Sequence, residues 1–122
     1  EAEHPWIGVR GLSVNSDIAN EMNLNSTRGF LVMNVTEEGP AERAGLKPGN
    51  RTVNVNGSSY QVGGDVIVAI EGQEMRGIED ILTYLAREAE VGEEVNITVN
   101  RDGRRVTIPL NLQDRPEEEE VS

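Results

Sequence analysis

The chain has 122 residues, of which 36% are hydrophobic and 3% aromatic, and its formal net charge is -11. This length fits one domain. The low content of aromatic residues favours a strand-rich core of Val, Ile and Leu, and we expect neither a cofactor cavity nor a metal. The negative charge repels phosphate backbones and anionic headgroups, so we expect neither nucleic acid partners nor membrane insertion by this fragment.

The N-terminal part of the chain predicts extended segments on either side of one helix. Residues 6–9 and 12–14 form one extended apolar segment. A helix is expected from Asp17 to Leu24, with Ser16 as its N-cap, because apolar residues recur there at helical spacing. A strand is expected from Gly29 to Val35, where almost every residue is apolar.

The next stretch predicts a short helix between two turns. Pro40 suits the first helical turn, where its missing N–H would be unpaired anyway. Gly45 suits the left-handed residue that ends such a helix, and Pro48-Gly49 predicts a second turn. The almost wholly apolar run 65–70 then predicts a central strand that is covered on both faces.

Residues 50–64 predict an inserted β-hairpin between that turn and the central strand. Two runs that are typical of strands flank Asn56-Gly57, a strong signal for a two-residue turn, so the hairpin is expected at about 51–63. The insertion could be a decoration or a second contact surface, and the sequence leaves both open.

The C-terminal part of the chain predicts a helix and a closing hairpin. Helical spacing of five apolar residues predicts the helix from about Ile78 to Glu90: Ile78, Ile81, Leu82, Leu85 and Ala89. Residues 95–99 and 106–110 alternate like half-buried strands around Asp102-Gly103, which is typical of a tight turn. The predicted fold is α+β and mainly β, a small antiparallel sheet or partly open barrel capped by two helices.

The run from Gly39 to Gly49, with its short helix, Gly-Leu and Pro-Gly, closely resembles the signature of a PDZ domain. Trp6-Ile7-Gly8-Val9 is similar to the Tyr-Ile-Gly-Val element of PDZ domains attached to HtrA-type serine proteases, and the order of elements resembles their circularly permuted bacterial and archaeal form. The resemblance covers roughly residues 5–112. It leaves 1–4 as a linker and 113–122 as an acidic disordered tail or linker.

The resemblance implies a module that binds the free C-terminus of another chain by adding it as a strand to a sheet edge. On this alignment the N–H groups of Ile7, Gly8 and Val9 meet the peptide carboxylate. A second set of residues lines the peptide groove: Trp6, Arg10, Leu12, Ile78 and Leu82. Ile81 and Leu85 are expected to turn inward to the core.

Ile78 stands where PDZ domains that require Ser or Thr two residues before the peptide end usually carry His. An Ile side chain cannot make that hydrogen bond, so the sequence predicts a preference for apolar side chains both at the terminus and two residues before it. No catalytic residue is expected in this fragment, because its only His is His4 and it contains no protease Ser motif.

The resemblance further implies that the parent protein is an exported or membrane-anchored serine protease facing outside the cytoplasm. Its partners would be C-terminal or unfolded peptide segments with apolar residues, with the parent protease domain or neighbouring subunits as further candidates. Two alternatives stay open: the same module in another protease or a secretion component, and a structural domain whose groove is occluded.

Overall fold

The computed structural model describes residues 4–116, so the predicted linker residues 1–3 and the acidic run 117–120 lie outside the described part. The elements follow one another in this order: β1 (Pro5–Trp6), β2 (Val9–Ser13), α1 (Ser16–Met22), β3 (Phe30–Val35), α2 (Pro40–Ala44), β4 (Arg51–Val55), β5 (Ser58–Val62), β6 (Val66–Ile70), β7 (Gln73–Glu74), α3 (Ile78–Arg87), β8 (Glu94–Arg101), β9 (Arg104–Asn111) and β10 (Gln113–Asp114).

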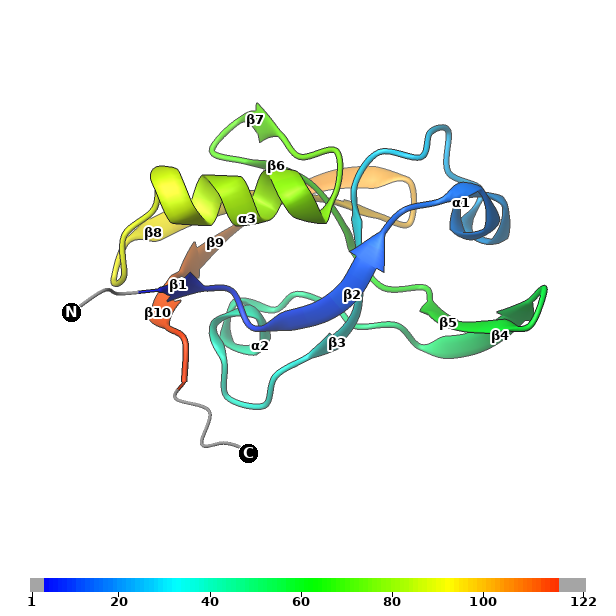
Figure 1. Cartoon of the computed structure of the whole chain (residues 1–122), viewed down its shortest axis with the longest axis horizontal. Coiled ribbons are helices and arrows are strands. Elements are labelled where there is room, and N and C mark those ends of the chain that lie inside the picture. Colours follow the sequence, from blue (N-terminus) through cyan, green and yellow to red (C-terminus); the bar gives the residue numbers. More distant parts are fainter. Residues whose placement is uncertain (1–3, 117–122) are drawn as a thin grey trace.

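The main sheet has the order β2-β3-β6-β8-β9, with β7 paired to β6, and every pairing in it is antiparallel (Figure 1). The sheet is open and does not close into a barrel, and the prediction of a mainly β, α+β fold is confirmed. The predicted turn at Asp102-Gly103 joins β8 to β9, and both residues have positive φ (53° and 83°), as a tight two-residue turn requires.

Two hydrophobic clusters form the core. The larger lies under α2 and α3, where aliphatic residues of the sheet meet Ala41 and Ile81. The smaller contains Val14, Ile18 and Val62, and thus joins α1 to the hairpin β4–β5. Helices α2 and α3 therefore cap the main core, and α1 covers the second cluster.

The inserted hairpin is present as predicted, in register from Arg51–Val62 to Val55–Ser58. The chain leaves the domain at Gly49 and returns beside it at Gly64, where a Cβ would lie only 2.8 Å from the Gly49 nitrogen. Val62 at its base is fully buried in the second cluster. The hairpin is therefore part of the hydrophobic core at its base and projects from the domain at its tip (Figure 1).

Three local predictions differ from the structure. The N-cap of α1 is Asn15 rather than Ser16, because the Asn15 side-chain oxygen accepts from the Ile18 N–H at 2.9 Å. The third helix ends at Arg87 instead of Glu90. The first extended segment is broken at Ile7–Gly8, because Gly8 adopts φ +84°, which a continuous strand does not allow.

The two ends of the described chain meet. β1 pairs with β10 in a small antiparallel sheet, the His4 N–H donates to Asp114 Oδ1 at 3.1 Å, and the His4 carbonyl accepts from Arg115. Ordered strand structure therefore continues two residues beyond the predicted domain end at 112.

A buried ion pair fixes the turn after α2. Asp65 is only 1% exposed, and its Oδ1 and Oδ2 accept from Arg101 Nε and Nη2 at 2.8 and 2.7 Å. Oδ2 also accepts from the Lys47 N–H at 2.9 Å, and Arg101 Nη2 donates to the Gly45 carbonyl at 3.1 Å. One carboxylate thereby ties the turn after α2 to the start of β6 and the end of β8.

Candidate functional site

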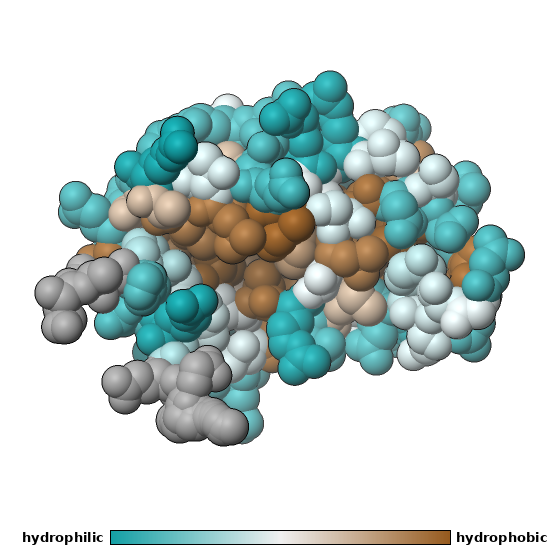
Figure 2. Space-filling view, viewed as in Figure 1, coloured by the Kyte–Doolittle hydropathy of each residue, from teal (hydrophilic) through white to brown (hydrophobic). Residues whose placement is uncertain are grey.

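The candidate site is the groove between β2 and α3. Within residues 4–116, β2 pairs only with β3, so its other edge is free to pair with another chain. Figure 2, drawn from the same side as Figure 1, shows apolar surface gathered in a hollow between α3 and β2. A free strand edge beside an apolar helix face is the arrangement in which an extended peptide adds to a sheet.

In the turn between β1 and β2, the backbone carbonyls are hydrogen-bonded to the domain, whereas the backbone N–H groups are free to bind a ligand. The carbonyl of Ile7 accepts from the Ala41 N–H, and the carbonyl of Gly8 accepts from the Thr36 N–H, both at 2.9 Å. No hydrogen bond from the Ile7 or Gly8 N–H to another group is found among residues 4–116. Successive free amides around a residue of positive φ form a concave anion site.

Trp6 lies against this turn. Its ring is 3.4 Å from the Cβ position of Gly8 and 3.3 Å from that of Gly39, and the indole is half-buried. The structure thus brings Trp6 to the turn of Ile7 and Gly8. The ring supports that turn from the side of α2.

The backbone of β2 alternates between β3 and the free edge. The Gly8 carbonyl accepts from Thr36, the residue after β3, and the Val14 N–H donates to the Gly29 carbonyl, the residue before β3. Because such bonds alternate along an antiparallel strand, the main-chain groups of Val9, Gly11 and Ser13 face the groove. Any side chain at Gly11 would collide with β3, since its Cβ would lie 1.8 Å from a carbonyl oxygen.

The side chains of β2 alternate as well. Half-buried Val9 packs against the main core, on the side of α3, whereas half-buried Leu12 packs against the second cluster. Arg10 is exposed and has the same strand parity as Leu12. The structure therefore brings Val9 to the groove and does not bring the side chains of Arg10 and Leu12 to α3.

Helix α3 presents one apolar face to the core and another to the groove. Ile81 is buried as expected, but its buried companion is Tyr84, whereas Leu85 is only half-buried. Ile78 is half-buried and Leu82 is 56% exposed, one helical turn apart. The groove face therefore runs along Ile78 and Leu82, whereas half-buried Leu85 packs against the main core, as expected.

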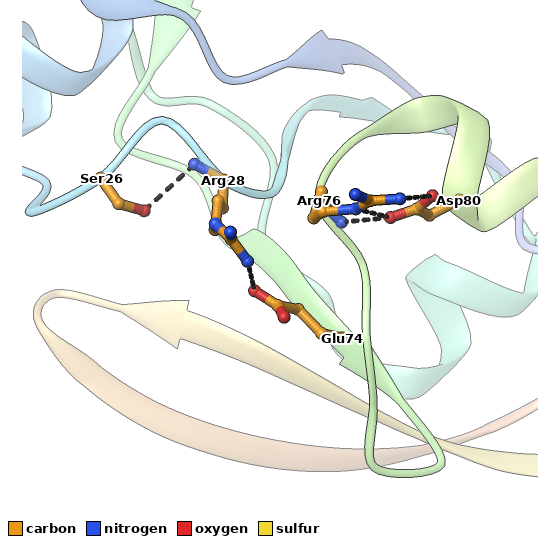
Figure 3. A network of polar contacts seen from close by, with 5 residues as sticks. All are labelled: Ser26, Arg28, Glu74, Arg76 and Asp80. Atoms are coloured by element: carbon orange, nitrogen blue, oxygen red, sulfur yellow. Dashed lines mark hydrogen bonds and ion pairs between the residues drawn. The ribbon is translucent and has the colours of Figure 1, made fainter.

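The first turn of α3 is held by side chains on both sides (Figure 3). Asp80 Oδ2 accepts from both the backbone N–H and Nε of Arg76 at 2.9 Å, and this bonding lowers the pKa of Asp80 and raises the pKa of Arg76. Beside it, Arg28 and Glu74 form an exposed ion pair. From β2, Ser13 Oγ accepts from the Ile78 N–H at 2.8 Å.

Ser13 is the residue at the groove that the sequence analysis missed. Ser13 gave no local signal, since its partner Ile78 is 65 positions away along the chain.

Within the described residues, no helix combines the length and apolar character needed to cross a membrane.

The model of the PDZ domain family matches residues 5–112. A DegP-like probable periplasmic serine endoprotease of Marinomonas sp. (strain MWYL1) is 31% identical over 116 residues, which are 95% of this chain and 21% of the relative. The chain thus spans about a fifth of the length of the curated relatives that it matches.

Among the solved structures that share the fold, two illustrate the similarity. The HtrA-type protease AlgW with a decapeptide superimposes with a TM-score of 0.74 and 28% identity, over 95% of this chain and 31% of that chain. The HtrA3 PDZ domain bound to a phage-derived ligand (FGRWV) has a TM-score of 0.68 at 16% identity, over 93% of this chain and 89% of that chain.

Proposed function

The chain belongs to the PDZ domain family, and we propose that it captures the free C-terminus of a peptide by strand addition to β2. The observation that carries this proposal is the turn at Ile7 and Gly8, whose carbonyls are bonded to the domain while its amides stay available. A carboxylate accepts several such bonds at once, and these charge-assisted bonds are stronger than those of a neutral amide. A peptide with a free C-terminus therefore binds better than its amide.

Apolar side chains at the peptide end fit the rest of the groove. The terminal residue lies beside Val9 and Leu82, and the residue two positions before it faces Ile78 at the start of α3. These helix residues are an exposed and a half-buried aliphatic side chain, which gain from contact with apolar surface. Affinity in the micromolar range, about -8 kcal/mol or weaker, is expected because ordering a flexible peptide offsets much of the contact energy.

An NMR titration of the labelled domain tests the carboxylate site. A peptide ending in apolar residues is added once with a free carboxylate and once as the C-terminal amide. Amide shifts at Ile7, Gly8 and Val9 that occur only with the free carboxylate support the proposal. The same shifts with both forms, or with neither, would contradict it. Trp6, the only Trp, gives a second readout by fluorescence, because its ring touches this turn.

A variant at the start of α3 tests the apolar preference. Two peptides are compared that differ only in Leu or Thr two residues before the end, and the wild-type domain favours Leu by about tenfold, the value of one buried aliphatic side chain. Ile78→His reverses or removes that preference. Glu79→His, at the exposed neighbouring position, is the control and keeps it. Tighter binding of the Thr peptide by wild type would overturn the assignment.

The parent protein is proposed to be an exported HtrA-like serine protease in which this domain holds substrates or regulates the protease. Support comes from the relatives, which are named periplasmic serine endoproteases and of which this chain spans about a fifth. The test is the cleavage rate of the full-length parent with and without a binding peptide. A changed rate indicates regulation, whereas an unchanged rate excludes regulation by the groove and leaves tethering only.

A further inference from the structure

We propose that the domain carries N-linked glycans at Asn25, Asn50 and Asn56, on the side of the molecule that holds α1 and the inserted hairpin. The inference goes beyond peptide binding and rests only on the proposed export of the parent protein, since such glycans mark exported chains. The sugar donor is a saccharide carried on a lipid phosphate. In the transfer, the Asn Nδ2 forms a bond to the anomeric carbon and loses one proton, while the bond from that carbon to the phosphate oxygen breaks.

The acceptor motif, Asn-x-Ser/Thr with any residue except Pro in the middle, is more frequent than the composition explains. The chain contains 11 Asn residues and 12 residues that are Ser or Thr, so about one such motif is expected by chance, yet five are present. They begin at Asn25, Asn34, Asn50, Asn56 and Asn96. The excess favours a role for the motif itself over a general abundance of Asn.

Three of these five Asn residues lie in accessible segments outside the main sheet. All five are exposed, but Asn34 and Asn96 belong to β3 and β8, each of which lies between two other strands. By contrast, Asn25 follows α1, Asn50 directly precedes β4, and Asn56 begins the turn between β4 and β5. A transferase needs the side chain and its neighbouring backbone at the surface, so these three are assigned as the acceptors.

The three acceptor side chains have no hydrogen-bond partner within residues 4–116, so Nδ2 can be substituted without the loss of a bond. Other Asn residues, which lack the motif, have structural roles instead. Asn15 caps α1, the Asn54 Oδ1 accepts from Ser59 Oγ at 2.5 Å, and the Asn100 Oδ1 accepts from the Gly103 N–H at 3.0 Å. The motif therefore occurs where the Asn side chain is not needed to hold the fold together.

Glycans at Asn50 and Asn56 would stand at the two ends of an exposed edge strand. Within the described part of the chain, β4 pairs only with β5. Residues 50–64 contain no acidic residue although the whole chain has 22, and Val53 and Tyr60 of the hairpin remain half-buried. Such an edge pairs with other chains unless charges, Pro or a covering group prevent it. Bulky hydrophilic glycans supply that cover.

The acceptors lie apart from the peptide groove. In Figure 1, α1 and the hairpin β4–β5 lie at the right-hand end of the molecule, whereas α3 and β1 lie toward the left. None of the three Asn residues belongs to β2, to α3 or to the turn of Ile7 and Gly8. The glycosylated domain therefore keeps its groove open.

Peptide mapping by mass spectrometry tests the proposal on the full-length protein, isolated from the cells that encode it after separation of cytoplasm from exported material. Fragmentation by electron transfer keeps each glycan on its Asn. Added sugar mass is expected at Asn25, Asn50 and Asn56, whereas Asn15, which has no motif, is the internal control and stays unmodified. Exported protein with all three sites unmodified would overturn the inference and leave peptide binding intact. Protein found only in the cytoplasm would overturn the proposed export as well.

Two variants of the full-length protein test whether the motif directs the modification. Thr27→Ala destroys the motif but leaves Asn25 in place, so the sugar mass at Asn25 is expected to disappear. Thr27→Ser keeps the motif and is expected to keep the sugar. Thr27 is exposed, so neither change disturbs the core. Sugar that persists at Asn25 in the Thr27→Ala protein would contradict N-glycosylation through this motif.

Discussion

Removal of the Arg101 side chain is expected to be the most damaging single loss of charge in the described domain. Arg101→Ala leaves the Asp65 carboxylate, which is 1% exposed, with only the Lys47 N–H of its present donors. Removing one partner of a buried ion pair costs about 3–5 kcal/mol, because the remaining charge is left uncompensated. Arg101 itself keeps 23% of its side-chain surface exposed, so water can reach the vacated place and the lower value, about 3 kcal/mol, applies.

That loss is large against the total stability of a small domain, about 5–15 kcal/mol. Urea unfolding followed by circular dichroism gives the free energy of unfolding, and the urea dependence itself should stay unchanged because the exposed surface on unfolding is the same. Arg104→Ala, in the exposed start of β9, removes the same side chain without a buried partner and is the control. If the two variants differed by less than about 1 kcal/mol, the assignment of a structural role to the Asp65 pair would be refuted.

Three further predictions concern glycine, pH and salt. Gly11→Ala forces a Cβ to within 1.8 Å of the Leu31 carbonyl oxygen and should destabilise the domain by about 3 kcal/mol or more. Gly57→Ala meets no atom within 4 Å and should cost only about 1 kcal/mol, because Gly57 has a positive φ. Urea unfolding of both variants measures these losses, and equal losses would contradict the prediction. The folded pKa of Asp80 is lowered by Arg76, so its contribution is present above the ordinary Asp pKa and lost as pH falls through the lowered value. Carbon-detected NMR of Asp80 between pH 2 and 6 should show this depressed titration, and an ordinary pKa would contradict it. A net charge of -11 should make the melting temperature rise between low and molar NaCl, and a fall would show that self-repulsion is not the dominant electrostatic effect.

The parts of the fold that depend on neighbouring residues could be predicted from sequence. Asn56-Gly57 and Asp102-Gly103 mark both hairpins, because positive φ at two successive positions strongly favours these residue types. Pro40 and Gly45 likewise fix the ends of α2. The cap of α1 shows the limit of local reasoning, since Asn15 and Ser16 are both suitable and the backbone geometry selects the first.

Contacts between distant segments could not be predicted. The period of α3 was evident, but how deeply each residue is buried depends on packing, which buries Tyr84 more fully than Leu85. The side chain of Leu12 packs against a second cluster, to which the distant inserted hairpin contributes Val62. The hydrogen bond from the Ile78 N–H to Ser13 Oγ joins two elements that are 65 positions apart, and neither local sequence indicates the contact.

The inserted hairpin has different constraints at its two ends. Its entry and exit lie together at Gly49 and Gly64, so the length of chain between them does not change the spacing of the main sheet. Val62 at the base is fully buried, whereas Asn56 and Gly57 at the tip are exposed. The tip can therefore accept grafted sequence, such as an epitope or a reactive handle for labelling, without disturbing the groove, provided that the base is kept.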